Sequence, residues 1–185
     1  MSDLYRIDGD VSVRTFVRQL LRGMSFKFIF WMRTASFLMT ASRGWRLLYP
    51  VARMMYRRYT FKLGISIPYQ TKIGSGFYIG HFGGIVVSSG ASIGTNCNLS
   101  QGVTIGQINR GPNKGTPHIG DHVYVGPGAK ILGRITVGSN VAIGANAVVI
   151  KDVPDGAVVV GVPARVISHE GSADYINRID YPTTL

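Results

Sequence analysis

The sequence predicts a mainly β fold, a prism of short stacked coils, with an α-helical module before it. Three observations lead to this prediction. Aliphatic residues return at every sixth position, small or apolar residues form a second set with the same period, and glycine follows many of the aliphatic residues. A period of six fits neither the helical repeat nor the alternation of an ordinary strand. It fits a coil with three flat faces, in which each six-residue unit supplies one strand and one corner.

The first residue of each six-residue unit is expected to point into the core. These residues are Ile67, Ile73, Ile79, Val87, Ile93, Leu99, Ile105, Ile119, Val125, Ile131, Val137, Ile143 and Val149. The fifth residue is expected to fill the tight corner inside the prism. These residues are Ala91, Cys97, Val103, Val123, Ala129, Ile135, Val141, Ala147 and Val153. Cys97 is the single cysteine, so it is expected to be a small core residue without a disulfide partner in the chain.

Two breaks in the register predict loops that leave the prism. Ile79 and Val87 are eight residues apart, so two extra residues follow the unit that holds His81. Ile105 and Ile119 are fourteen residues apart, and residues 107–118 between them are typical of a polar, projecting loop. Long loops on a rigid scaffold usually serve binding or catalysis.

The net charge of +11 belongs to the N-terminal part of the chain. Residues 1–64 hold twelve Lys and Arg against three Asp, whereas the remainder holds eight against six. The repeat region is therefore nearly balanced, and we expect no nucleic-acid partner. The single cysteine and the lack of a secretory signal favour a cytoplasmic location.

Three regions are predicted: a basic amphipathic helical module (1–64), the repeat domain (65–167) and a tail (168–185) without periodicity, either loose or dependent on a partner. Helices are expected near residues 11–24 and 45–61, the second with a kink or boundary at Pro50. No apolar run is long enough to span a bilayer. Two alternatives stay open for residues 11–62: peripheral contact with the inner face of the membrane, or packing against the end of the prism.

His81 is the candidate for chemistry, because it lies inside a coil between glycines with extra residues directly after it. An imidazole can act as a general base toward an attacking hydroxyl. The alternative is a hydrogen-bonded surface histidine. His118 and His122, together with His81, raise the further alternative of a three-histidine zinc site, against ordinary loop or surface histidines.

Several motifs, in order, show a resemblance to a known family. They are Lys72-Ile73-Gly74, Ile79-Gly80-His81-Phe82-Gly83-Gly84, Gln101-Gly102-Val103-Thr104-Ile105-Gly106, Gly126-Pro127-Gly128-Ala129-Lys130 and Gly161-Val162-Pro163-Ala164-Arg165. The segment from 65 to 167 resembles the hexapeptide-repeat acyltransferases, most closely the serine acetyltransferase-like branch. This resemblance implies a left-handed parallel β-helix, assembled as a trimer or a pair of trimers, with acetyl-CoA between subunits and no metal.

The resemblance also implies roles for particular residues. His81 matches the catalytic histidine of the family, which deprotonates the acceptor hydroxyl. The residues that match positions contacting acetyl-CoA are Gly106, Pro127, Gly128, Ala129, Lys130 and Ala145, and Lys151 and Arg165 are placed to meet its phosphates. Thr116 stands where serine acetyltransferases carry a second histidine, and His118 lies two residues later. Both are expected to contact the acceptor.

Two departures from the family pattern concern the acceptor. Serine acetyltransferases carry an aspartate directly before the catalytic histidine and another fifteen residues before it, where this sequence has Gly80 and Ser66. From these departures and the short basic module we expect an O-acetyltransferase of polysaccharide biosynthesis that acts on a sugar hydroxyl. The alternatives are a serine O-acetyltransferase, a zinc-dependent hydratase on the same fold, and a non-catalytic basic adaptor for membrane or nucleic acid.

Overall fold

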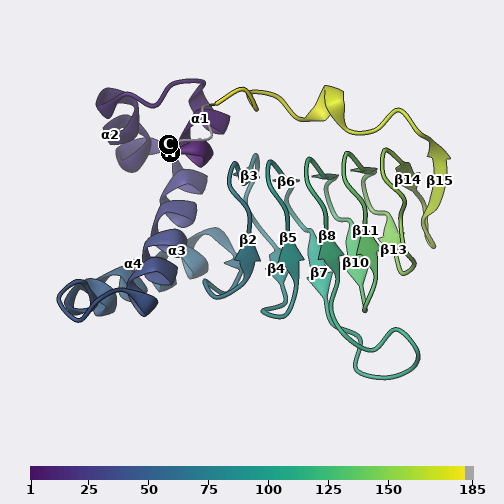
Figure 1. Cartoon of the computed structure of the whole chain (residues 1–185), viewed down its shortest axis with the longest axis horizontal. Coiled ribbons are helices and arrows are strands. Elements are labelled where there is room, and N and C mark those ends of the chain that lie inside the picture. The colour runs from purple at the N-terminus through teal and green to yellow at the C-terminus, as the bar shows by residue number, and fades with distance from the viewer. Residues whose placement is uncertain (182–185) are drawn as a thin grey trace.

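The computed structural model describes residues 1–181 and contains the three-sided prism that the repeat predicts (Figure 1). Successive strands enter three sheets in turn, so each sheet collects parallel strands from successive coils. Sheet A contains β1 (Ile65–Ser66), β4 (Ile85–Val87), β7 (Thr104–Gly106), β10 (Lys130–Leu132) and β13 (Val148–Val149). Sheet B contains β2 (Lys72–Ile73), β5 (Ser92–Ile93), β8 (His118–Ile119) and β11 (Thr136–Val137). Sheet C contains β3 (Tyr78–Ile79), β6 (Asn98–Leu99), β9 (Tyr124–Val125), β12 (Ala142–Ile143), β14 (Val158–Val160) and the antiparallel β15 (Arg165–Ser168).

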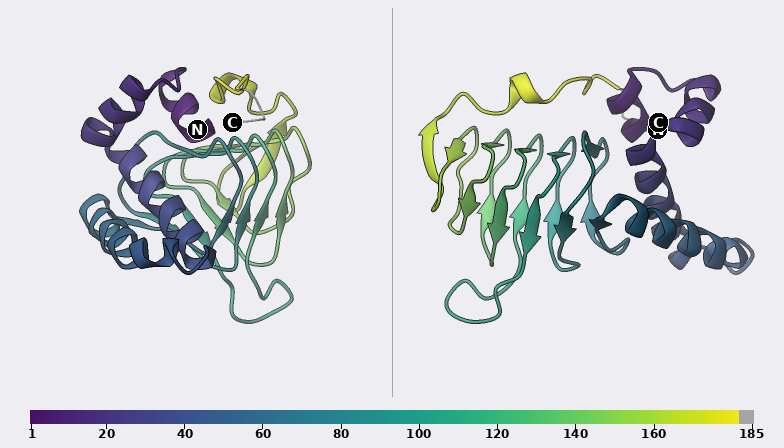
Figure 2. Two further views of the ribbon diagram at one scale, coloured as in Figure 1. Left: turned by 60° about the vertical axis from the view of Figure 1, so that its left-hand side comes forward. Right: turned by 180° about the vertical axis from the view of Figure 1, so that it is seen from behind.

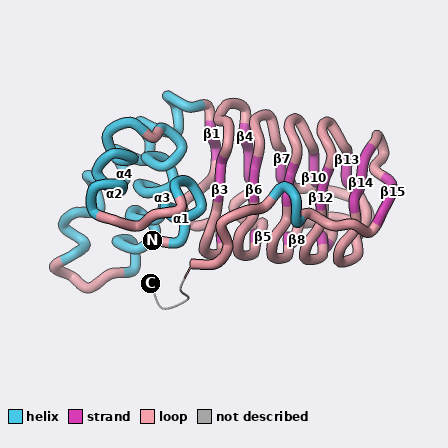
Figure 3. The backbone as a smooth tube through the Cα atoms, turned by 90° about the horizontal axis from the view of Figure 1, so that it is seen from above, coloured by secondary structure: helices cyan, strands magenta, loops and turns pink. Residues whose placement is uncertain are grey.

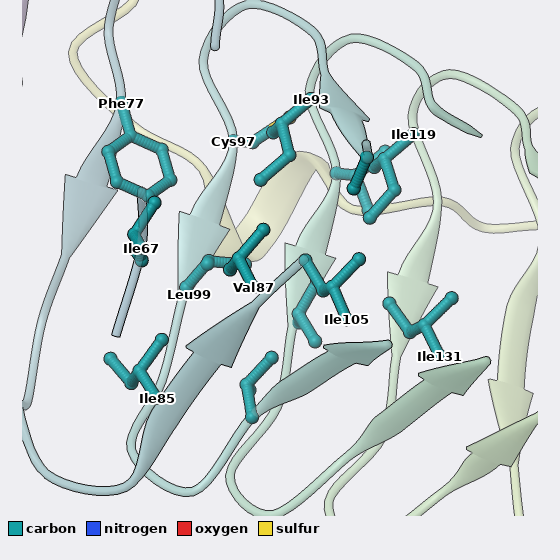
Figure 4. Close-up of a cluster of buried hydrophobic side chains, with 14 of the residues drawn as sticks. Ile67, Phe77, Ile85, Val87, Ile93, Cys97, Leu99, Ile105, Ile119 and Ile131 are labelled. Atoms are coloured by element: carbon teal, nitrogen blue, oxygen red, sulfur yellow. The ribbon is translucent and has the colours of Figure 1, made fainter. Parts of the chain in front are cut away.

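The core of the prism is built from the two predicted sets of residues. Every predicted corner residue is buried, and so is every predicted strand residue except Ile73 in the first coil, which is partly buried. Figure 4 shows several of these side chains, such as Ile93, Leu99 and Ile105, stacked from coil to coil. Cys97 lies among them, and burial raises the pKa of its thiol to about 12. The six-residue period therefore predicted the core correctly.

Strand pairing locates both breaks in the register. Ile65 pairs with Ile85, a coil of 20 residues, and Val86 pairs with Thr104, a coil of 18. Thr104 then pairs with Lys130, a coil of 26 residues. The first insert therefore lies in the corner at 80–84. The second is the loop between β7 and β8, which projects from the prism in Figure 1.

The N-terminal helices gather at the β1 end of the prism (Figure 2). They are α1 (Ser2–Asp8), α2 (Val13–Arg22), α3 (Met24–Thr40), a 3-10 turn η1 (Trp45–Leu48) and α4 (Tyr49–Leu63). Ser12 caps α2 by accepting the Thr15 N–H, and Pro50 lies in the first turn of α4, so this proline marks a boundary and not a kink. Within residues 1–181, no helix has both the length and the apolar character needed to cross a bilayer.

The helix α1, which the sequence did not predict, fastens this module to the first two coils. The Asp3 carboxylate accepts the Phe77 N–H at 2.8 Å and pairs with the Arg33 guanidinium at 2.7 Å. Arg6 is buried and donates to the Gly76 carbonyl at 3.2 Å and to the Asn98 side chain. Burial lowers the pKa of Arg6, which is consistent with this enclosed position. The inner faces of the helices therefore pack on the prism.

Residues 168–181 pack along the prism, whereas the sequence left open a tail that is either loose or dependent on a partner. They run back along the outer face of sheet C to α1, as Figure 3 shows from above. Tyr175 stacks on Tyr124 with ring centroids 4.4 Å apart, and its carbonyl accepts from Asn98 at 2.8 Å. The Tyr181 hydroxyl donates to Asn96 at 2.7 Å. This strap ties both ends of the prism together; residues 182–185 lie outside the described part of the chain.

Candidate active site

His81 lies at the corner where the chain passes from β3 in sheet C to β4 in sheet A. The corner carries the two-residue insert, and its turn depends on Gly83 and Gly84, whose φ angles are 115° and 64°. Side chains other than glycine seldom adopt such angles. His81 and Phe82 are exposed on this corner, and no hydrogen bond of the His81 ring to another described residue is present. The imidazole is therefore free to meet a substrate.

Further corners of the same kind continue behind His81 in the following coils. The Gly83 carbonyl accepts the Gly102 N–H at 2.8 Å, the Gln101 carbonyl accepts the Gly128 N–H at 2.9 Å, and the Pro127 carbonyl accepts the Asn146 N–H at 2.8 Å. These bonds stack the corners into one continuous edge. Three residues expected to contact acetyl-CoA lie along this edge: Pro127, Gly128 and Ala145. Ala129 is also in this row, but its side chain is buried in the core, so only its backbone is available.

The remaining residues expected to contact the donor lie farther from this edge. Lys130 is on the outer face of sheet A, where its ammonium donates to the Gly102 carbonyl at 2.5 Å and to the Thr104 hydroxyl at 3.2 Å. Gly106 ends β7 and Lys151 lies just after β13, both at the opposite edge of sheet A. Arg165 is exposed at the start of β15. The predicted donor contacts thus extend across sheet A and along both of its edges.

Thr116 and His118 do not lie beside His81 in a single chain. The Thr116 hydroxyl donates to the Gly90 carbonyl at 2.8 Å, which places it at the corner from sheet A to sheet B. His118 is exposed on the outer face of sheet B, with its Nδ1 2.8 Å from the Ser92 hydroxyl. Both are separated from the His81 corner by the width of sheet A. One chain alone therefore does not bring the two predicted acceptor residues and the predicted base together.

The three histidines of the zinc alternative are also apart. His81 is at the corner from sheet C to sheet A, His118 is on sheet B, and His122 is at the corner from sheet B to sheet C, with its Nε2 3.2 Å from the Asn96 amide. Within residues 1–181, no group of three His, Cys, Asp or Glu side chains is close enough to hold a metal ion. This geometry does not favour a three-histidine site within one chain.

A hollow of about 160 Å³ lies directly beside the His81 corner, and no sequence motif indicates it. Gly80 and Tyr78 form one wall, and residues of α1, α2 and α3 form the other, including Gln19 and Ser25. A Cβ atom on Gly80 would lie 3.3 Å from the Tyr78 ring. The hollow exists only because the helical module docks on the first coil, a long-range contact that no local motif signals.

Comparison with known proteins gives a consistent result. A family model described as bacterial transferase hexapeptide (six repeats) matches residues 116–151. The serine acetyltransferase of Staphylococcus epidermidis is 42% identical over 123 residues, 66% of this chain and 58% of that protein. The crystal structure of serine acetyltransferase from Brucella abortus matches with a TM-score of 0.74 at 32% identity and covers 92% of this chain and 68% of that chain. This chain belongs to the hexapeptide-repeat acyltransferases, in the serine acetyltransferase-like branch.

Other solved members of this branch are equally similar. The serine acetyltransferase of Neisseria gonorrhoeae in complex with serine has a TM-score of 0.72 at 33% identity and covers 90% of this chain and 66% of that chain. The Brucella abortus enzyme in complex with coenzyme A has a TM-score of 0.75 at 32% identity and covers 92% and 66%. The chain spans 58% of the length of the first curated relative that it matches.

The comparisons correct the sequence-based hypothesis about the acceptor. We expected an O-acetyltransferase of polysaccharide biosynthesis with a sugar hydroxyl as acceptor, and this expectation is wrong. The curated relatives and the solved structures named above are serine acetyltransferases. The hypothesis inferred the acceptor from two missing carboxylates, at Gly80 and Ser66, and from the short basic module. The absence of two carboxylates does not by itself identify a different acceptor.

Proposed function

We propose that this chain is a serine O-acetyltransferase that uses acetyl-CoA as donor and His81 as general base. The observation that carries the proposal is the exposed His81 at the head of a continuous corner row, in a chain 42% identical to a serine acetyltransferase. Solved relatives at 32–33% identity bind serine and coenzyme A. We also propose that the β-helix is left-handed, because the fold of this chain matches that of these relatives.

The chemistry assigned to His81 is acyl transfer from sulfur to oxygen. The imidazole takes the proton of the serine hydroxyl while that oxygen attacks the thioester carbon of acetyl-CoA. Backbone N–H groups at the corner stabilise the negative charge that develops on the carbonyl oxygen. The carbon–sulfur bond then breaks, and the imidazolium returns its proton to the departing CoA thiolate. The products are O-acetylserine and CoA, and His81 ends in its starting state.

A trimer completes the site in this proposal. Thr116, at the end of the projecting loop, and His118, in β8, lie beyond the edge of sheet A opposite to His81. An acceptor that contacts these two residues and His81 must therefore lie between two copies of the chain. The donor lies in the groove between two subunits, along the row of Pro127, Gly128 and Ala145 with Lys130 next to it. Gly106 and Lys151 are at the opposite edge of sheet A, so they are proposed to meet the donor from the neighbouring subunit, with Lys151 and Arg165 near its phosphates. Such an arrangement places the thioester next to His81 of one subunit and the acceptor loop of its neighbour.

The proposal is tested by measuring release of free CoA from acetyl-CoA with L-serine, L-threonine, D-serine or no acceptor. We expect L-serine to give the highest rate. An equal rate with and without L-serine would contradict serine as the acceptor. A higher rate with another acceptor would support the acyltransferase reaction but not serine as its acceptor.

Introducing an aspartate at Gly80 is expected to raise kcat/KM for serine by about tenfold. A Cβ on Gly80 would face the Tyr78 ring and the hollow beside the His81 corner, so a carboxylate there is placed to pair with the ammonium group of serine. A hydrogen bond to a charged group is worth about 1.5 kcal/mol, or about tenfold in kcat/KM. Gly80 has no positive φ, and the new Cβ needs only a small shift of the Tyr78 ring, 3.3 Å away.

Gly80→Asn is the matched control, because asparagine has the same shape without the charge. The steady-state rate of CoA release should rise with Gly80→Asp alone. Equal kinetics for the two variants would show that a carboxylate at this position does not help to bind serine.

A further inference from the structure

The outer surface of η1 and α4 is both apolar and basic. Leu47 is 81% exposed, Phe61 76% and Met54 62%, which is unusual for large apolar side chains. The apolar residues of this surface are Trp45, Leu47, Leu48, Val51, Met54 and Phe61, and its cations are Arg46, Arg53, Arg57, Arg58 and Lys62. We name this set of residues the basic apolar face. No other part of the described chain covers it.

The geometry of α4 explains why these residues share one side. Ala52, Tyr56 and Leu63 are buried against α3 and the first coil, as helical spacing requires. Met54 and Phe61 are seven residues apart, two helical turns, so they lie in one line on the opposite side. Basic residues lie on both sides of this line. An ordinary surface helix presents polar groups where α4 presents methionine and phenylalanine between arginines.

The cations of the basic apolar face form no ion pair with a carboxylate of the described chain. The ion pairs found in residues 1–181 are Arg18 with Asp8 and Arg33 with Asp3, both in the helical module but outside this face. Residues 11–64 contain no Asp or Glu, although they hold eleven Lys and Arg. The charge of the basic apolar face is therefore available to a negative partner from outside the chain.

We propose that the basic apolar face docks this protein on an anionic lipid bilayer surface. A helix with aromatic and aliphatic residues between arginines lies in the plane of the bilayer interface, with its apolar side chains at the acyl boundary and its cations at the headgroups. Trp45 suits that depth, because indole prefers the interface. The helix α2 carries a second set of the same kind, with Val13, Val17 and Leu21 exposed.

Other occupants fit the basic apolar face less well. A second copy of the same face would bring like charges together, because residues 11–64 of that copy also lack acidic side chains. A nucleic acid would match the cations but would leave the large apolar side chains of the face without apolar contacts. An anionic bilayer offers negative headgroups to the cations of the face and acyl chains to its apolar side chains.

The test is co-sedimentation of the full-length protein with vesicles of phosphatidylcholine alone or mixed with phosphatidylglycerol. We expect binding to the mixed vesicles, little binding to phosphatidylcholine alone, and weaker binding as salt screens the charges. Arg53→Glu with Arg57→Glu should lower the partition coefficient by about 25-fold or more, because each cation near an anionic surface strengthens binding about fivefold. Trp45→Ala with Phe61→Ala should lower it by about tenfold through loss of apolar burial.

Lys72→Glu with Arg134→Glu is the matched control, since it changes the net charge equally but lies on the prism, outside the basic apolar face. It should retain binding to the mixed vesicles. Equal binding of all variants, equal binding to both kinds of vesicle, or concentration-dependent self-association that Trp45→Ala with Phe61→Ala abolishes would overturn the proposal. This proposal is independent of which molecule accepts the acetyl group. Substitutions in the basic apolar face should leave the rate of CoA release in solution unchanged.

Discussion

Replacement of His81 with alanine is expected to lower the rate of serine-dependent CoA release by about 10²- to 10⁴-fold, the usual contribution of a positioned general base. His81 is exposed at the head of the corner row, and no other group acts as general base in the proposed reaction. The effect should appear in kcat, because the imidazole acts on the proton that moves as the hydroxyl attacks. Steady-state kinetics with saturating acetyl-CoA measure it.

His169→Ala is the matched control, since this histidine is exposed in the C-terminal strap, away from the corner. It should leave kcat unchanged. A His81→Ala protein that assembles normally and retains the full rate would remove His81 from the mechanism.

Replacement of Phe77 with alanine is expected to lower the free energy of unfolding by about 3–5 kcal/mol. Phe77 is fully buried in the first coil, and its backbone N–H donates to Asp3 of α1, so it lies at the junction of module and prism. A cavity there weakens both the core and the docking of α1. Thermal unfolding at fixed protein concentration measures the loss, since association contributes to the stability of an oligomer.

The matched control is Phe82→Ala, five residues later, where the side chain is 46% exposed. Surface substitutions of this kind usually change stability by no more than ~0.5 kcal/mol. Similar losses of unfolding free energy in the two variants would indicate that burial of Phe77 does not stabilise the junction between the helices and the prism.

The prism could be predicted because its rule is local. An aliphatic residue six positions after the last, such as Leu99 after Ile93, must face inward once three short strands complete a coil, so the core follows from spacing alone. The helix α1 and the C-terminal strap follow no such rule. They are held by a few long-range contacts, such as Asp3 with Phe77 and Tyr175 with Tyr124, and their sequences contain no period that indicates a partner.

The position of the His81 corner was predictable too, because the glycines and the insert around His81 mark it. Pro127, Gly128 and Ala145 were expected from the family resemblance, and backbone hydrogen bonds stack their corners in the same row as His81, while their roles stay predictions. Two features depended on contacts that the sequence does not show. The hollow beside Gly80 needs the docked helices, and the separation of Thr116 from His81 across sheet A follows from which corner each occupies.

The most direct test of the central claim is to incubate the purified protein with acetyl-CoA and L-serine and to quantify free CoA and O-acetylserine together by mass spectrometry. The proposed mechanism predicts one O-acetylserine for each CoA released, at a rate that rises with serine concentration and is lost in His81→Ala. CoA release that is independent of serine, or that yields no O-acetylserine, would contradict it.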